Sequence, residues 1–149
     1  MKINFNGYVR GKNRATIREA AQFFLQELLG SRKAGNTQLD LRFRQLRCGA
    51  SGYCQIHEDE DNNYSPKMFT IDINGNLSIK DMLETLAHEM VHLRQFRNKE
   101  LGYRENYTLY RGTAYRLDLP YSKEPWEKEA YKLEKVLVKK FVAFAQQHQ

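Results

Sequence analysis

Residues 78–93 read Ser-Ile-Lys-Asp-Met-Leu-Glu-Thr-Leu-Ala-His-Glu-Met-Val-His-Leu, and this stretch decides the fold. Ser78 and Asp81 have the spacing of a capping box, with Asp in place of the more usual Glu or Gln. Apolar residues then recur at helical spacing and form one stripe, which consists of Ile79, Met82, Leu83, Leu86, Met90 and Leu93. The pattern predicts a helix that begins after Ser78.

The same stretch contains His88, Glu89 and His92 in the order H-E-x-x-H. Residues four apart lie on one face of a helix, so the two imidazoles can bind a single metal ion. The glutamate between them is then held beside the metal, where it can take a proton from bound water. These positions fall largely off the apolar stripe, where a purely structural helix would more often carry Lys, Gln or Glu. We expect His88 and His92 to bind Zn²⁺ and Glu89 to act as the catalytic base.

A third zinc ligand is expected, because a peptidase zinc has three protein ligands and an open position for water. No histidine follows the motif at a structured position, so the ligand is expected to be a carboxylate. The best segment is 124–131, which opens a last helix that Ser122 or Glu124 can cap and that tolerates Pro125 in its first turn. Glu127 and Glu129 lie on opposite flanks of this helix's apolar stripe, which consists of Trp126, Ala130, Leu133, Leu137, Phe141 and Phe144. Periodicity alone does not choose between them.

H-E-x-x-H on one helix with a glutamate on a later helix resembles the gluzincin metallopeptidases. In that clan the ligand glutamate usually has a small residue three positions later, which lets the two zinc-binding helices approach closely. Ala130 follows Glu127 at this interval, whereas Lys132 follows Glu129. The resemblance therefore implies Glu127 as the third ligand, together with a minimal zincin fold. Tyr131 stands where many gluzincins have an Asp that supports a ligand histidine.

Residues 83–92 also look like the corresponding part of the SprT-like minimal metalloproteases, which act on proteins attached to DNA. Those proteins generally have a third zinc-binding histidine and often a C-terminal Cys-rich zinc ribbon, and this chain has neither.

The remaining sequence predicts an α+β fold in a single domain, residues 1–149. Thr16 and Glu19 form a capping-box pattern that would open an N-terminal helix ending at Gly30. Three strands are expected near residues 39–43, 51–57 and 69–73, the last closed by a turn at Asn74-Gly75. The short connections suggest a small antiparallel sheet beside the H-E-x-x-H helix. Its edge strand could then bind an extended substrate peptide.

The connection between the two proposed metal-binding helices, residues 98–123, is rich in Tyr and Arg. Residues 108–110 and 115–117 can pair as a hairpin around Gly112. Long connections near a site often form its walls, and a tyrosine or arginine here can stabilise an oxyanion. The sequence does not identify which one, and these rings can equally cover the core.

The acidic run 58–63 and His57 are expected to lie outside the site. The acidic run 58–63 resembles a calcium loop that starts at Asp59, but Tyr64 and Thr70 occupy its Gly and closing Glu positions, so we expect a solvated hairpin tip. His57 is expected to be an ordinary strand residue. Cys48 and Cys54 are too far apart for a zinc knuckle and are interpreted as two free thiols.

The charge of the chain bears on its partners. The net charge is +6, and residues 1–50 carry ten Lys and Arg against three Asp and Glu. Arg42 and Arg44 fall on one face of a predicted strand and can follow a nucleic-acid backbone, bind an acidic protein or form a solvated face. The N-terminus lacks an apolar run long enough for a signal peptide, and no segment can span a membrane, so a cytoplasmic location is expected.

These features together predict a zinc metallopeptidase that hydrolyses peptide bonds in protein substrates. The alternative is a metal-stabilised module that binds nucleic acid or protein and has little peptidase activity. An intact Glu89 favours the enzyme, because a structural zinc needs no base. The substrate and the cleavage preference stay open.

Overall fold

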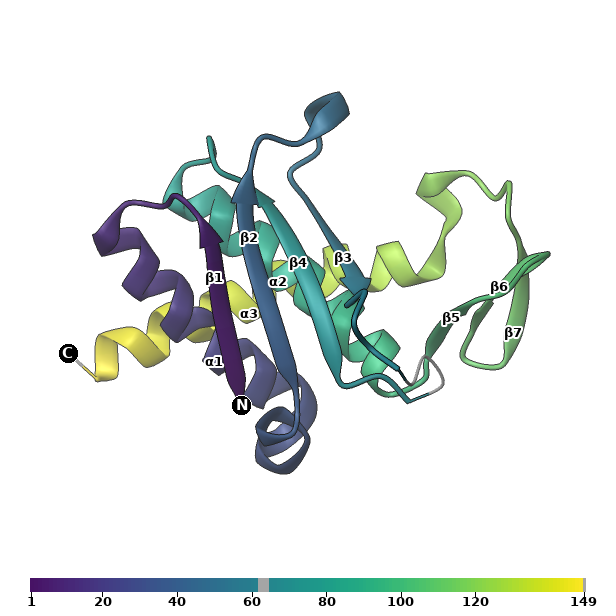
Figure 1. Ribbon diagram of the computed structural model, residues 1–149, viewed down its shortest axis with the longest axis horizontal. Helices are drawn as coiled ribbons and strands as arrows, with labels where there is room; N and C mark the ends of the chain where they lie inside the picture. The colour runs from purple at the N-terminus through teal and green to yellow at the C-terminus, as the bar shows by residue number, and fades with distance from the viewer. Residues whose placement is uncertain (62–64, 149) are drawn as a thin grey trace.

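The computed structural model describes residues 1–61 and 65–148, which form a mixed α+β structure with two small sheets. Its first half contains β1 (Lys2–Gly7), α1 (Gly11–Gly35), β2 (Gln38–Arg44), the 3₁₀ helix η1 (Arg47–Gly49), β3 (Gly52–Ile56) and β4 (Met68–Asn74). Its second half contains α2 (Ile79–Arg97), β5 (Leu101–Tyr103), β6 (Tyr107–Tyr110), β7 (Thr113–Arg116), the 3₁₀ helix η2 (Tyr121–Lys123) and α3 (Pro125–Gln147). Figure 1 shows the three α-helices on one face of the larger sheet.

The larger sheet has the strand order β1-β2-β4-β3 and is mixed. β1 pairs with β2 and β2 with β4 in parallel, and only β3 runs antiparallel to its neighbour β4. The expectation of a three-stranded antiparallel sheet was therefore wrong, and β1 was missed. The physical reason is the crossover: α1 joins β1 to β2, and a helical connection returns the chain to form a parallel pair. β4 pairs with both β2 and β3 and lies between them, which leaves β3 at the edge of the sheet.

The helix-facing side of this sheet is apolar and the opposite side is polar. Leu39, Leu41 and Phe43 of β2 are buried and alternate with polar residues, as expected for a sheet covered on one face. On the polar side, Arg42 and Arg44 both bond to the buried carboxylate of Asp72 on β4, at 2.6 and 2.7 Å. Asp72 thus neutralises part of the positive charge that the sequence assigned to this strand.

α1 differs from its predicted boundaries. It begins at Gly11 after Arg10, whose side chain forms no capping hydrogen bond, so the predicted Thr16–Glu19 capping box was wrong. Thr16 lies inside the helix and donates its hydroxyl to the Lys12 carbonyl instead. The predicted stop at Gly30 corresponds to an interruption with φ of +79°, after which the chain resumes a helical course to Gly35.

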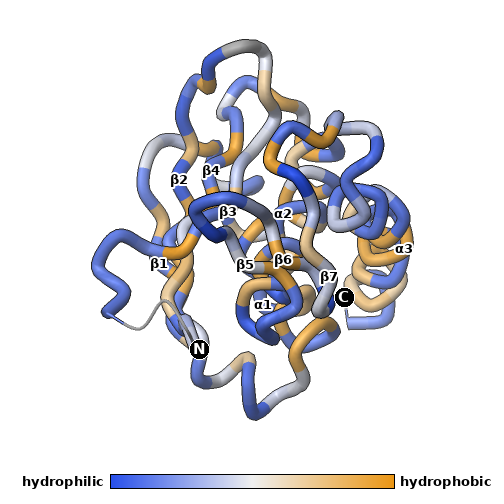
Figure 2. The backbone as a smooth tube through the Cα atoms, turned by 90° about the vertical axis from the view of Figure 1, so that its right-hand side faces the viewer, coloured by the Kyte–Doolittle hydropathy of each residue, from blue (hydrophilic) through white to orange (hydrophobic). Residues whose placement is uncertain are grey.

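α2 is the central element and contacts α1, α3, β3, β4 and β5. Ser78 caps it by accepting a hydrogen bond from the Asp81 amide, as the sequence predicted. Neighbours on several sides bury the apolar stripe from Met82 onward and also His88, Glu89, His92 and Gln95. α3 packs along it, and Figure 2 shows hydrophobic and hydrophilic stretches alternating along α3.

The connection from α2 to α3 forms a second antiparallel sheet of β5, β6 and β7. The predicted hairpin around Gly112 is confirmed, with Thr108 opposite Tyr115, whereas β5 was not foreseen. α3 then begins with Pro125 in its first turn after Glu124, and no side chain caps it.

His57 and the described part of the acidic run make their contacts outside the H-E-x-x-H motif. His57 is 2.8 Å from Asp40, and Glu60 accepts hydrogen bonds from the Lys67 and Met68 amides. Asn62, Asn63 and Tyr64 of the expected hairpin tip fall outside the described residues. Cys54 carries a free thiol, and the Cys48 side chain falls outside the described part. In the described residues, no helix has both the length and the apolarity to cross a membrane.

Candidate metal centre

The structure brings His88, His92 and Glu127 together. Their potential ligand atoms all lie within 4.8 Å of one another. The Nε2 atom of His88 is 2.9 Å from one carboxylate oxygen of Glu127, and the Nε2 atom of His92 is 3.0 Å from the other. One turn of α2 thus supplies two imidazoles, and the first turn of α3 supplies a carboxylate that faces both.

Each imidazole is oriented by a partner on its other nitrogen. His92 Nδ1 is 2.8 Å from Gln95 Oε1, and Gln95 is fully buried with its amide donating to the Trp126 carbonyl and to Glu129. His88 Nδ1 is 3.4 Å from a carboxylate oxygen of Glu134. Such partners fix the ring and its tautomer, so that the Nε2 atoms of both rings are directed toward Glu127.

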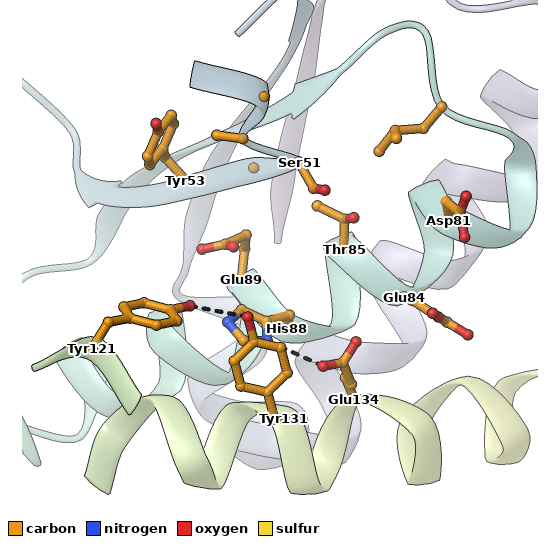
Figure 3. Close-up of a pocket in the computed structure, with 14 residues that line it drawn as sticks. Ser51, Tyr53, Asp81, Glu84, Thr85, His88, Glu89, Tyr121, Tyr131 and Glu134 are labelled. Atoms are coloured by element: carbon orange, nitrogen blue, oxygen red, sulfur yellow. Dashed lines mark hydrogen bonds and ion pairs between the residues drawn. The ribbon is translucent and has the colours of Figure 1, made fainter. Parts of the chain in front are cut away.

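Tyr131 and Tyr121 complete one wall of the site. The Tyr131 ring packs edge-on against His88, with ring centroids 4.5 Å apart. Tyr121 donates its hydroxyl to Glu127 over 2.9 Å, and this hydroxyl is also 3.1 Å from that of Tyr131 (Figure 3). Tyr131 carries no carboxylate, and the acid that contacts His88 is Glu134.

Glu129 belongs to a different cluster. Its carboxylate bonds to Arg94 of α2, to Arg111 beside the β6–β7 turn and to Gln95. Glu100 bonds to the same two arginines. Glu129 is therefore held away from the imidazoles, with Gln95 between it and His92.

Glu89 lies beside the imidazoles with no hydrogen bond or ion pair to any described residue, although only 7% of its surface is exposed. Burial raises the pKa of Glu89 to about 7, and the neighbouring charges of His92 and His88 only partly oppose this. The Glu127 carboxyl shows the reverse. Burial would raise its pKa, but hydrogen bonds from His88 and His92 hold that pKa well below its ordinary value.

Two cavities meet at Glu89. The larger one, of about 660 Å³, extends from His88 along α2 to Asp81. The smaller one, of about 190 Å³, is lined by His92 and Glu127 together with Cys54, Phe96 and Tyr103. The three potential metal ligands therefore face open space, which a catalytic zinc site would need for water and substrate.

Gln95, Glu134 and Tyr121 were not identified from the sequence, although two of them carry a signal there. Gln95 follows His92 by three residues, and Glu134 follows Glu127 by seven, so each shares a helix face with a predicted ligand. Tyr121 lies in the connection, where periodicity gives no information.

Comparison of the chain with protein-family models, curated proteins and solved structures gave no match.

Proposed function

We propose that this protein is a zinc-dependent metallopeptidase with the architecture of a minimal zincin. The observation that carries the proposal is the convergence of His88, His92 and Glu127 beside a buried carboxylate, Glu89, that is bonded to no residue in the described part of the chain. Two imidazole nitrogens and one carboxylate oxygen are donors that Zn²⁺ accepts in catalytic sites. Bound there, the ion supplies Lewis acidity that activates water and polarises the scissile carbonyl.

The residues of the chain have separate roles in this proposal. Glu89 takes a proton from the attacking water and delivers it to the leaving amine, and it lies beside both imidazoles with no competing hydrogen bond to a described residue. Gln95 and Glu134 hold the two imidazoles in orientation. The outer edge of β3, which passes close to Glu89, offers backbone hydrogen-bonding groups to an extended peptide.

Glu89 also separates this proposal from a binding module. Burying a carboxylate without a partner costs free energy, and a zinc that only stabilises the fold does not require such a group. Binding to nucleic acid through Arg42 and Arg44 is less favoured, because Asp72 bonds to both guanidinium groups.

Metal analysis and cleavage of a denatured protein, followed by mass spectrometry, test the proposal. Purified protein is expected to hold about one zinc per chain, and His88→Ala and His92→Ala are expected to lose it. Glu89→Gln is expected to keep zinc but to lose activity by a factor on the order of a hundred or more. His57→Ala, which removes a histidine bonded to Asp40 outside the site, is the matched control and should keep both. The proposal would be refuted if a variant with both His88→Ala and His92→Ala still held one zinc per chain, or if the zinc-loaded wild type cleaved no substrate.

A further inference from the structure

Four carboxylic acid side chains line the larger cavity, three from α2 and one from α3. It is lined by Asp81, Glu84, Glu89 and Glu134, and no lysine or arginine is among its lining residues. This is unusual within a chain that carries 24 Lys and Arg against 18 Asp and Glu. The charge of the cavity is therefore local and opposite in sign to that of the whole chain.

The positions of these carboxylates follow from the two helices. Asp81 and Glu84 precede His88 by seven and four residues, so all three project from one face of α2. Glu134 projects from α3 across the cavity (Figure 3). At 1.5 Å per residue, Glu84 lies about 6 Å and Asp81 about 10 Å along the helix from His88. The acidic groups thus form a row that leads away from the candidate metal centre.

Among the described residues, no lysine or arginine is paired with the carboxylates of this row. No described residue forms an ion pair with Asp81, Glu84 or Glu89, and the described ion pairs of Glu134 are limited to His88. Other acidic groups of the same chain are paired: Asp72 bonds to Arg42 and Arg44, and Glu129 to Arg94 and Arg111. Glu89 is more than nine-tenths buried and points into the cavity, with no hydrogen bond or ion pair to a described residue.

The two cavities at Glu89 differ in chemistry. The smaller one has Cys54, Phe96 and Tyr103 in its wall, and its own carboxylate, Glu127, is bonded to His88 and His92. The larger one combines Asp81, Glu84 and Glu134 with Thr85 and the Tyr131 ring. A substrate chain crossing Glu89 would therefore meet the row of carboxylates on the side toward Asp81.

We propose that the larger cavity is the subsite for a lysine or arginine side chain adjacent to the scissile bond, with Glu84 as its main specificity determinant. This inference rests on the proposed peptidase function and names its substrate class. A basic side chain can lay its aliphatic stem along Thr85 and Tyr131 while its charged end reaches Glu84. Glu84 is only partly exposed, so its attraction for a cation is screened less than that of a surface carboxylate.

Peptide binding tests this inference without relying on turnover. The protein is the Glu89→Gln variant, in zinc-loaded and zinc-free forms. The probes are short alanine-based peptides that carry one lysine at each position in turn, and matched peptides with norleucine there. For one position, lysine is expected to improve affinity by about tenfold or more, as for a hydrogen bond to a charged group. Adding Glu84→Gln is expected to abolish this difference without changing the affinity for norleucine.

Two controls make the test specific. Glu19→Gln removes one negative charge from an exposed position on α1 and should leave the preference for lysine intact. Glu84→Lys should reverse the preference for lysine. A peptide with glutamate at that position should then bind more tightly than the peptide with lysine there. Equal affinity for lysine and norleucine at every position, or a lysine preference that survives Glu84→Gln, overturns the inference. Either result leaves zinc content and Glu89-dependent cleavage unaffected, so failure here differs from failure of the proposed function.

Discussion

Glu89 is held in the fold at an energetic cost. It is 7% exposed and bonded to no described group, and burial raises its pKa from 4.5 to about 7. Between these two values the folded state binds more protons at Glu89 than the unfolded state does. Stability contributed by this residue therefore falls as the pH rises from 4.5 to 7 and stays low above that range.

This linkage predicts that Glu89→Gln stabilises the metal-free protein at alkaline pH. Above pH 8 the variant is expected to unfold with a free energy higher than that of wild type by on the order of 1–3 kcal/mol, because a neutral amide replaces a buried anion. At pH 4.5 the difference should largely vanish. Urea unfolding at the two pH values, with chelator present, measures it. A variant that is no more stable than wild type at pH 8 would contradict this account of Glu89.

Single residues also show where sequence reasoning stops. The relative positions of His88, Glu89 and His92 on α2 could be predicted, because spacing along one regular helix fixes which residues share a face. Glu127 and Glu129 lie on opposite flanks of the apolar stripe of α3. Deciding which of them faces the two histidines therefore requires knowing the residues that each one contacts. For Glu129 these are Arg94 and Arg111, which are distant in sequence.

Among the elements, α2 follows its predicted course because a side-chain cap and an apolar stripe agree. The sheet does not, because the order of strands depends on pairing between distant segments. β4 is buried on nearly its whole length, which suits a central strand. In β1, the apolar residues Ile3 and Phe5 alternate with polar residues, which is typical of a strand. The helix that follows indicates a crossover to a parallel strand.

The close packing of β3 against α2 predicts an effect of Gly52→Ala. A Cβ at Gly52 would lie 2.6 Å from Thr85 Cγ2, 2.8 Å from the Asp72 carbonyl oxygen and 3.3 Å from Glu89 Cγ. The strand must therefore move away from the helix, at a cost of about 1–3 kcal/mol. The loss in cleavage rate, expressed as a free energy, should exceed the loss in the free energy of unfolding. The reason is that both cavities share this strand as a wall.

Thermal unfolding and cleavage rates, measured on the same preparations, check this expectation. Gly11→Ala is the matched control, because no atom lies within 4 Å of its added Cβ. That variant should resemble wild type in both measurements. If Gly52→Ala cleaves peptide at the same rate as the wild type, the position of β3 is unimportant for the reaction.

The cluster around Glu129 predicts how the second sheet is attached. Glu129→Ala leaves Arg94 and Arg111 each without one carboxylate partner, and Arg94 has only 14% of its side chain exposed. The loss is expected to cost about 1–3 kcal/mol and to increase hydrogen exchange in β5–β7, while zinc stays bound. Asp118→Ala breaks a fully solvated pair with Arg116 and should change little. If Glu129→Ala loses zinc while hydrogen exchange in β5–β7 is unchanged, Glu129 does not attach the second sheet.

At the scale of the whole molecule, the candidate metal centre joins two helices that are far apart in sequence. His88 and His92 come from α2, which packs against the large sheet, and Glu127 comes from α3, which follows the small sheet. A metal ion bound to all three would link these parts in the folded state only. Its binding free energy therefore adds to the free energy of unfolding.

Chelation is accordingly expected to lower the melting temperature of the zinc-loaded protein. At free zinc a thousandfold above its Kd, binding stabilises by about 4 kcal/mol, which for a chain of this size corresponds to roughly 10 °C. Differential scanning calorimetry with and without chelator measures the shift. Glu127→Ala should nearly abolish it, because one of three protein ligands is lost, whereas Glu129→Ala should melt lower in both states and keep the shift. A zinc-dependent shift that survives in Glu127→Ala but disappears in Glu129→Ala would assign the third ligand to Glu129.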